Sequence, residues 1–181
     1  MKQRLIATLL QMALCVALGS TALASTTWYV NGVSGSNSND CKSSTAACNT
    51  IGRAISLAAS GDSVMIAAAT YGENLTVNIS LKLIGSGATS TIIDGGGIAS
   101  VIVILNTAAN VTLSKVTVRN GVSAFGGGIY NQGTLTVTNS TISGNLAADS
   151  WGYAYGGAIY NSGTLAINNS TLSGNFASAS F

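Results

Sequence analysis

The chain has 181 residues, of which 47% are hydrophobic and only 7% are charged, and it contains no histidine. Acid–base catalysis by histidine is therefore excluded. Without Lys2 and Arg4 the chain keeps five cations and five anions, so its formal net charge falls from +2 to zero. This balance argues against nucleic acid as a partner, because such binding needs a clustered basic face.

The first 24 residues have the pattern of an export signal. A charged start is followed by a mostly apolar run at residues 5–18, and residues 22–24 (Ala-Leu-Ala) form a small-x-small cleavage pattern. We expect the mature chain to begin near Ser25 and to be extracellular or at the cell surface of a bacterium, associated with the outer membrane. The apolar run is too short to span a bilayer comfortably, and no later segment is long and apolar enough, so we predict no membrane span in the mature chain.

Residues 25–63 are predicted to form an N-terminal cap. Cys41 and Cys48 are the two cysteines left after the signal, and in an exported chain they predict a disulfide beside residues 28–30. Two thiols without histidine do not complete a zinc site.

Residues 49–60 are the one helical candidate of the chain. Asn49 or Thr50 can cap the start, Gly61 can end the helix, and the apolar positions fall on one face. We expect this amphipathic helix to cover the open first coil of the domain that follows.

A repeated block predicts the architecture of residues 64–181. GGGIYNQGTLTVTNSTISGN (126–145) recurs as GGAIYNSGTLAINNSTLSGN (156–175) at an offset of 30 residues, and VTLSKVTVRNG (111–121) matches part of the block at an offset of 24. Repeats of this period are typical of stacked, quasi-one-dimensional folds.

Alternation within the block predicts short strands at residues 127–131, 134–139 and 140–143, separated by Gly or Asn corners. Parallel stacking would place Leu135 on Leu165, Val137 on Ile167 and Asn139 on Asn169. We therefore predict an all-β parallel β-helix. The competing fold is an antiparallel sandwich of short strands.

A family resemblance supports this fold. TIGRAISLAASGDSVMIAAATYGENLTVNISLKLIGSG (50–87) resembles the opening of right-handed parallel β-helix proteins of the pectin-lyase-like superfamily, T-I-x-x-A-I, A, G-D-x-[IV], G-T-Y-x-E and L-x-L-x-G. Ala68 and Ala69 stand where that pattern has Pro-Gly. The superfamily includes pectate lyases, pectin esterases, surface adhesins and proteins of no known activity, so the resemblance implies a right-handed coil without choosing an activity.

The GGAIYN block at 156–161 and its variant at 126–131 are similar to the GGA[ILV] repeats of polymorphic outer-membrane proteins and related bacterial surface passengers. The companion F-x-x-N motif of those repeats is missing, because Phe176 follows Asn175 instead of preceding an Asn by three positions.

The carboxylates do not form a recognisable catalytic pattern. Glu73 and Asp94 lie nearly one coil apart, with Lys115 and Arg119 one to two coils further on. Either this group is catalytic, or Asp94 supports the DGGG turn, Glu73 marks a strand entrance and Arg119 is solvated. We predict no catalytic, cofactor-binding or metal-binding residue.

Three aromatic residues mark a candidate contact loop. Trp151, Tyr153 and Tyr155 lie in the longest predicted loop, residues 146–155, where they can stack on sugar rings or on a partner. The alternative is that they fold back over the stack.

The chain stops where another block is expected, so we predict an uncapped C-terminus and expect the chain to be the N-terminal part of a longer β-helix or a truncated product. Two functions follow. The first is an exported, non-catalytic repeat protein for surface adhesion or passenger-type interaction, whose partner is a polysaccharide or a host or cell-surface molecule. The second is the N-terminal fragment of a polysaccharide-active, pectate-lyase-like enzyme.

Overall fold

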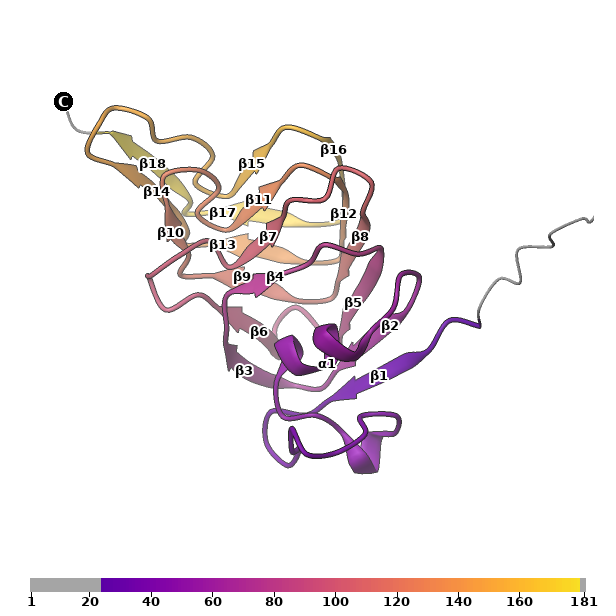
Figure 1. Ribbon diagram of the computed structural model, residues 1–181. Coiled ribbons are helices and arrows are strands. Elements are labelled where there is room, and N and C mark those ends of the chain that lie inside the picture. The colour runs from indigo at the N-terminus through magenta and orange to yellow at the C-terminus, as the bar shows by residue number, and fades with distance from the viewer. Residues whose placement is uncertain (1–23, 180–181) are drawn as a thin grey trace, which may run out of the picture.

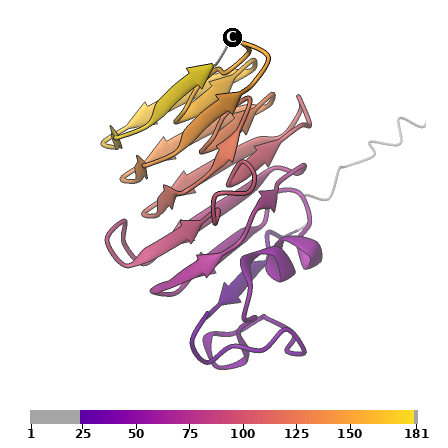
Figure 2. The same ribbon diagram turned by 90° about the vertical axis from the view of Figure 1, so that its left-hand side faces the viewer.

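The computed structural model describes residues 24–179, and apart from Ala24 the predicted export signal lies outside them. The described chain winds into a stack of coils, in which each short strand lies beside the equivalent strand of the next coil (Figures 1 and 2). Every strand pairing within residues 24–179 is parallel. The predicted parallel β-helix is therefore confirmed, and the antiparallel sandwich is excluded.

Equivalent strands form four sheets along the stack. The six-stranded sheet contains β1 (Thr27–Val30), β2 (Ser63–Ile66), β5 (Leu81–Gly85), β8 (Asn110–Ser114), β12 (Thr134–Thr138) and β16 (Thr164–Asn168). The five-stranded sheet contains β3 (Ala69–Gly72), β6 (Thr91–Asp94), β9 (Thr117–Arg119), β13 (Thr141–Ser143) and β17 (Thr171–Ser173). The four-stranded sheet contains β4 (Leu75–Thr76), β7 (Ile102–Ile104), β11 (Ile129–Asn131) and β15 (Ile159–Asn161). The three-stranded sheet contains β10 (Val122–Ser123), β14 (Leu146–Asp149) and β18 (Phe176–Ala179).

The register between coils follows the sequence repeat. Leu135 pairs with Leu165 and Val137 pairs with Ile167, as predicted from the offset of the two blocks. Successive inward side chains thus stack into apolar columns that fill the interior. One column runs through Trp28, Val64, Leu83, Leu113, Val137 and Ile167. Burial of these columns supplies the main cohesion of the stack, at about 1.5–3 kcal/mol for each fully buried aliphatic side chain.

The corner after each of the last three strands of the six-stranded sheet, β8, β12 and β16, uses a left-handed backbone conformation. Asn139 and Asn169 have φ values of 51° and 47° at matching positions, and the N–H of Asn139 donates to the carbonyl of Asn168. Lys115, at the same corner one coil earlier, has a φ of 57°. Asparagine tolerates this conformation better than most residues, which accounts for its repeated use here.

The coils contain one strand more than the sequence predicted. Residues 146–149 form β14, which pairs with both β10 and β18, so the predicted loop 146–155 begins only after Asp149. Small residues such as Ala147, which is buried in the stack, give this strand a weak propensity. Pairing with neighbouring coils, and not local sequence, makes it a strand.

The predicted helix is confirmed but is shorter than residues 49–60. Helix α1 spans Ile51–Leu57, and the side chain of Thr50 caps it by accepting a hydrogen bond from the N–H of Arg53. A 3₁₀ turn, η1 (Ser44–Ala46), precedes it. The helix ends early because the chain turns at residues 58–61, where the carboxylate of Asp62 accepts the N–H of Ala59. The helix packs against β1, β2 and β4, at the start of the stack.

The opposite end of the described stack is open. No other element within residues 24–179 covers the far side of the coil that carries β15 to β18. Its inward-facing Ile167 and Leu172 are consequently 39% and 43% exposed, whereas Val137 and Ile142, one coil earlier, are fully buried.

Candidate functional site

The group that could have been catalytic is divided among separate structural contacts. Asp94 and Arg119 pair on neighbouring strands β6 and β9, and Nε of Arg119 lies 2.8 Å from Oδ2 of Asp94. The other carboxylate oxygen of Asp94 accepts the N–H of Gly96 within the DGGG turn, and Asn120 donates to Oδ2. Burial raises the pKa of Asp94, but these donors outweigh it and hold the pKa below its ordinary value of 3.8.

Glu73 and Lys115 serve other parts of the fold. The carboxylate of Glu73 accepts the backbone N–H groups of Ile51 and Gly52, at 2.8 Å each, and so caps the first turn of α1. A negative charge is favourable there because it pairs with otherwise unsatisfied N–H groups. Lys115 is exposed at its corner. The four residues of the predicted group therefore do not converge on one site.

Asp62 is the most buried carboxylate of the described chain, with 4% of its surface exposed. It accepts hydrogen bonds from the N–H of Thr26, the indole N–H of Trp28 and the N–H of Ala59, at 2.7 to 2.8 Å. Desolvation by burial raises the pKa of Asp62, but the three hydrogen bonds outweigh it and lower the pKa below 3.8. Asp62 therefore joins β1, the end of α1 and the start of β2.

The predicted disulfide between Cys41 and Cys48 is present, and both cysteines are fully buried. The segment that it closes lies beside β1, as expected. The N–H of Tyr29 donates to the carbonyl of Cys41, and the N–H of Cys48 donates to the carbonyl of Tyr29. The disulfide thus holds the loop of the cap against the first strand.

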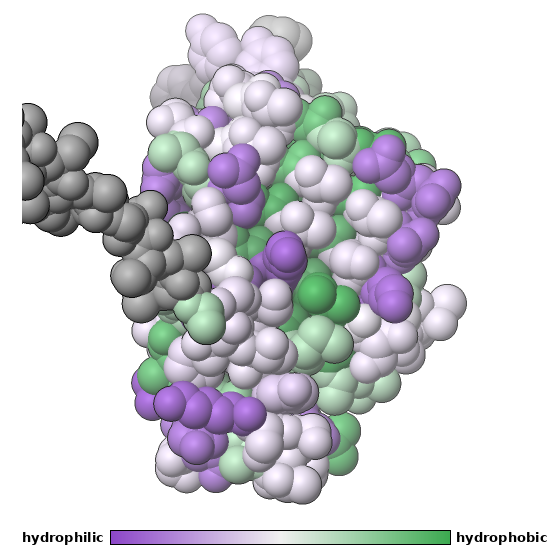
Figure 3. Space-filling view, turned by 90° about the vertical axis from the view of Figure 1, so that its right-hand side faces the viewer, coloured by the Kyte–Doolittle hydropathy of each residue, from purple (hydrophilic) through white to green (hydrophobic). Residues whose placement is uncertain are grey.

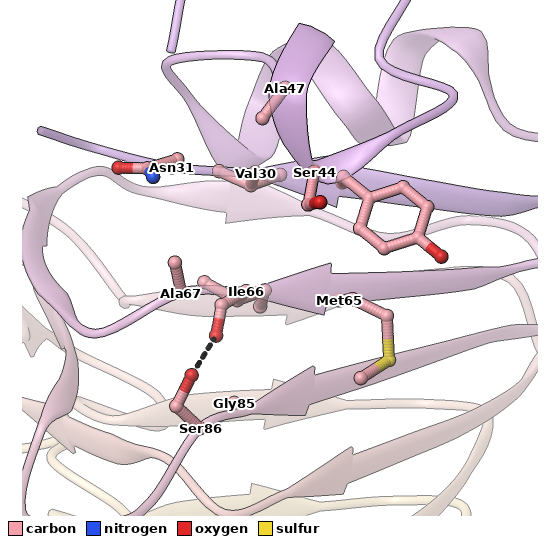
Figure 4. Close-up of a pocket in the computed structure, with 10 residues that line it drawn as sticks. Val30, Asn31, Ser44, Ala47, Met65, Ile66, Ala67, Gly85 and Ser86 are labelled. Carbon is pink, nitrogen blue, oxygen red and sulfur yellow. Dashed lines mark hydrogen bonds between the residues drawn. The ribbon is translucent and has the colours of Figure 1, made fainter. Parts of the chain in front are cut away.

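A cavity of about 250 Å³ lies next to this loop, beside the ends of β1, β2 and β5 (Figure 4). Its apolar walls include the side chains of Met65 and Ala47, and Tyr29 also lines it. The hydroxyl of Ser86, one of its polar groups, already donates to the carbonyl of Ile66. No Asp, Glu, Lys or Arg lines this cavity.

Four aromatic side chains at the other end of the stack form what we call the aromatic cluster: Phe125, Tyr130, Tyr155 and Tyr160. The rings of Tyr130 and Tyr160 stack with their centroids 5.3 Å apart and their planes inclined by 18°. Phe125 stacks on Tyr155 at 5.7 Å and meets Tyr160 edge to face at 5.3 Å. The contacts join rings from two neighbouring coils into one continuous surface.

The cluster faces outward from the stack. Within β11, Ile129 and Asn131 are buried while Tyr130, between them, is half-buried, which is the alternation of a strand with one inward face. Phe125 is 36% exposed and Tyr155 is 50% exposed. The cluster is therefore open to a partner while its strands are held by the core.

A glycine turn in each coil brings the rings together. Gly126 and Gly156 have φ values of 65° and 71°, and a Cβ atom on either one would overlap the carbonyl oxygen of the isoleucine three residues later. Glycine is therefore required at both positions. The turn carries the chain from Phe125 into β11 and from Tyr155 into β15, and a parallel bridge pairs these two aromatic residues.

The predicted contact loop lies next to this cluster in the sequence. Tyr155, the last of its three aromatic residues, belongs to the cluster. Trp151 and Tyr153 are 82% and 60% exposed, so they do not fold back over the stack. Asp149 orders the loop, because its Oδ2 accepts the backbone N–H groups of Trp151 and Tyr153 at 3.0 Å each.

Phe125, Tyr130 and Tyr160 belong to the candidate site but were not predicted from the sequence. The signal was present: each block has an aromatic residue directly before its glycines and another at the Tyr of IYN, so that both pairs repeat at an offset of 30. What the sequence could not show is that the turn places these positions within contact distance of one another.

The part of the sequence that carries the cluster is almost free of charge. From residue 120 to the end of the sequence, Asp149 is the only charged residue. On the side of the molecule where β8 and β12 of the six-stranded sheet lie, side chains of intermediate hydropathy surround a hydrophobic stripe and a few hydrophilic groups (Figure 3). Half-buried Thr112, Thr134 and Thr136 lie on the strands of this sheet.

Within the described range 24–179, no group of three or more Cys, Asp or Glu side chains could hold a metal ion. No helix in that range is long and apolar enough to cross a membrane. The chain matches no protein-family model, no curated protein and no solved structure.

Proposed function

We propose that this chain is an exported β-helix repeat protein that acts as a non-catalytic interaction module, in surface adhesion or as a passenger-type protein. The observation that carries the proposal is the exposed aromatic cluster on a rigid stack of coils. Aromatic residues are enriched where proteins bind partners, because they supply a large contact area at a small entropic cost. A face of this kind suits binding without chemistry.

The pattern of residues 1–24 supports export to the bacterial surface or beyond it. The disulfide between Cys41 and Cys48 supports the same assignment, since disulfides persist in oxidising compartments and are rare in the cytosol.

The carboxylates accept hydrogen bonds within the fold, and this favours a binding function over a catalytic one. Each Asp and Glu within residues 24–179 accepts at least one hydrogen bond that shapes a turn, a loop, a helix end or a strand junction; these residues are Asp40, Asp62, Glu73, Asp94 and Asp149. Glycoside hydrolysis instead needs two carboxylates that face each other across a sugar bond.

The proposal is tested by incubating the purified chain with pectin and related polysaccharides in the presence of Ca²⁺. We expect no shortened or unsaturated oligosaccharides. Release of such products, abolished in both Asp94→Ala and Arg119→Ala, would establish the enzymatic alternative and overturn the proposal.

A parallel assay measures attachment of the labelled chain to intact cells or cell-wall preparations. There the double variant Tyr130→Ala/Tyr160→Ala should lose attachment, while Thr112→Ala/Thr136→Ala should keep it.

A further inference from the structure

We propose that the open end of the stack binds an extended segment of another chain that carries the repeat's own pattern S-T-x-S-G-N; this inference does not depend on the aromatic cluster. The open end is the outer side of the coil that carries β15 to β18, at the top of Figure 2. Within residues 24–179, each of these four strands has a paired neighbour on one side only. An unpaired edge of this kind can accept a further strand, and main-chain hydrogen bonds then supply much of the affinity.

A column of serine residues defines one contact that the open end offers. Oγ of Ser140 accepts the N–H of Val116, one coil earlier, at 3.3 Å. Oγ of Ser170 accepts the N–H of Ser140 in the same way, at 3.1 Å. Among the described residues, the N–H of Ser170 itself has no hydrogen-bond partner. It is therefore placed to donate to a serine hydroxyl of one further coil.

A column of asparagine residues defines a second and more specific contact. Oδ1 of Asn145 accepts the N–H of Gly121 at 2.9 Å, and its side-chain amide donates to the carbonyl of Val118 at 3.2 Å. Asn175 repeats both contacts one coil later. Its Oδ1 accepts the N–H of Asn145 at 3.1 Å, and its amide donates to the carbonyl of Ile142 at 2.8 Å.

The corresponding groups of the last coil are the N–H of Asn175 and the carbonyl of Leu172. Thr171 and Ser173, on either side of Leu172, bond the preceding coil through their backbone, so the carbonyl of Leu172 faces the open side. The N–H of Asn175 has no partner within residues 24–179. An asparagine side chain suits this pair, because it has both an acceptor and donors, whereas an aspartate has acceptors alone.

The other positions of the pattern have structural roles of their own. The apolar residue x fills the interior, as buried Ile142 does, and it would cover Leu172, which is 43% exposed. Gly144 and Gly174 have φ values of 62° and 60°, so the corner before the asparagine requires the left-handed conformation that glycine adopts readily. The residues that bind, pack and turn therefore stand at fixed spacing, and this spacing selects a segment of the same pattern.

Burial supports the same partner. Ser140 and Asn145, which lie beneath another coil, are 3% and 1% exposed. Ser170 and Asn175 occupy the same positions at the open end and are only half-buried. No charged residue follows Asp149 in the sequence, so an uncharged segment can cover this end without the cost of burying an unpaired charge.

A folded second copy cannot supply such a segment. The loop of the cap covers the edge of β1, where the N–H of Tyr29 donates to the carbonyl of Cys41 and the N–H of Asn31 donates to that of Cys48. Each later coil of the described chain is already paired with the coil before it. Two open ends placed face to face do not reproduce the contacts either, because Ser170 and Asn175 already bond the coil beneath them. The partner is therefore a segment that is not yet part of a stack.

The test uses the purified full chain and a fluorescein-labelled peptide with the sequence of residues 164–176, TLAINNSTLSGNF. Fluorescence anisotropy should show saturable binding. Peptides with Ser170→Ala, Asn175→Ala or Asn175→Asp should bind at least about tenfold more weakly, because each loses a hydrogen bond that would be buried. Thr171→Ala in the peptide removes an outward-facing side chain and should change the affinity no more than about twofold.

Variants of the chain locate the binding surface. Leu172→Lys places a charge on the inward face of the open coil and should abolish binding, whereas Ser173→Lys places it on the outer face of the same strand and should leave binding intact. Circular dichroism establishes that both variants are folded. Amide hydrogen exchange of the native chain gives an independent readout, because the peptide should protect the N–H groups of Ser170 and Asn175. If Leu172→Lys does not fold, this protection decides the question.

The inference is overturned if the peptide shows no saturable binding at millimolar concentration, if the alanine peptides bind as tightly as the parent, or if the two amides gain no protection. A dimer of the chain alone in analytical ultracentrifugation, broken by Leu172→Lys, would also overturn it by making a second copy the occupant. None of these results removes the proposed function. That fails separately, if the chain cleaves polysaccharide or if loss of the aromatic cluster does not affect attachment to cell surfaces.

Discussion

Asn131 donates a 2.6 Å hydrogen bond from its side-chain amide to Oδ1 of Asn161, which occupies the equivalent position in the next coil. The amide of Asn131 is buried, at a position that pairs with Ile104 in the preceding coil. It also donates to the carbonyl of Gly133, and its Oδ1 accepts the N–H of the same glycine. The polar side chain is therefore fully used in joining a strand, a turn and the next coil.

Asn131→Ala should destabilise the protein by about 1–3 kcal/mol, because it leaves the buried N–H and carbonyl of Gly133 without their side-chain partner. Urea denaturation followed by circular dichroism measures the loss. Asn110→Ala changes an exposed asparagine at the start of β8 and should stay within about 0.5 kcal/mol of the native chain. Equal effects of the two variants would contradict a special role for the buried amide.

The stability of the fold should fall in acid because of Asp62. Its folded-state pKa lies below the ordinary value of 3.8, so in the acid range the unfolded chain binds more protons than the folded chain. This stabilisation is fully present above about pH 4–5 and is lost as the pH falls through the folded-state pKa. Asp94, with a pKa lowered in the same direction, adds a smaller effect because its partner Arg119 is 40% exposed.

Thermal melts between neutral pH and the acid range test this expectation. Asp62→Asn should lower the melting temperature at neutral pH and should show a smaller further decrease in acid than the native chain. Asp40→Asn removes a carboxylate from an exposed turn and should keep the acid sensitivity of the native chain. An unchanged pH profile in Asp62→Asn would show that other groups control acid unfolding.

Two glycines with similar backbone angles separate steric overlap from conformational strain. Gly126 and Gly96 have φ values of 65° and 63°, but a Cβ atom on Gly126 would overlap the carbonyl oxygen of Ile129, whereas Gly96 has open space. Gly96→Ala should cost about 1–2 kcal/mol, the penalty for an L-residue in the left-handed region. Gly126→Ala should cost clearly more, as measured by thermal or urea unfolding. Similar losses in both variants would mean that the turn before β11 can relax.

Lys115 offers a stabilising substitution. It adopts a φ of 57° at the corner where Asn139 and Asn169 stand in the following coils. Lys115→Asn should therefore raise the free energy of unfolding by a few tenths to about 1 kcal/mol, because asparagine adopts this conformation more readily. Lys82→Asn, in the extended strand β5, should not stabilise the protein, since asparagine is unfavourable in strands. Urea midpoints of the two variants make the comparison, and a loss of stability in Lys115→Asn would contradict the expectation.

Much of the fold could be predicted because its main signals are local or strictly periodic. Alternation around Leu135 and Val137 marks a strand with one buried face, and the offset of 30 residues identifies Leu165 and Ile167 as their partners in the next coil. The same kind of local evidence offered Asn49 or Thr50 as the cap of the helix, and the structure uses Thr50. The disulfide between Cys41 and Cys48 could be predicted because disulfides are stable in the oxidising compartments that an exported chain is expected to reach.

Only the tertiary structure decided which outward or polar side chains meet. Strand β14 is too poor in β-forming residues to be recognised alone, and its pairing with β10 and β18 defines it. The contact between Phe125 and Tyr160, like the hydrogen bond between Asn131 and Asn161, depends on how the glycine turns position successive coils. Alternation along a strand reports only which face a residue lies on, whereas contacts across coils depend on the path of the turns between strands.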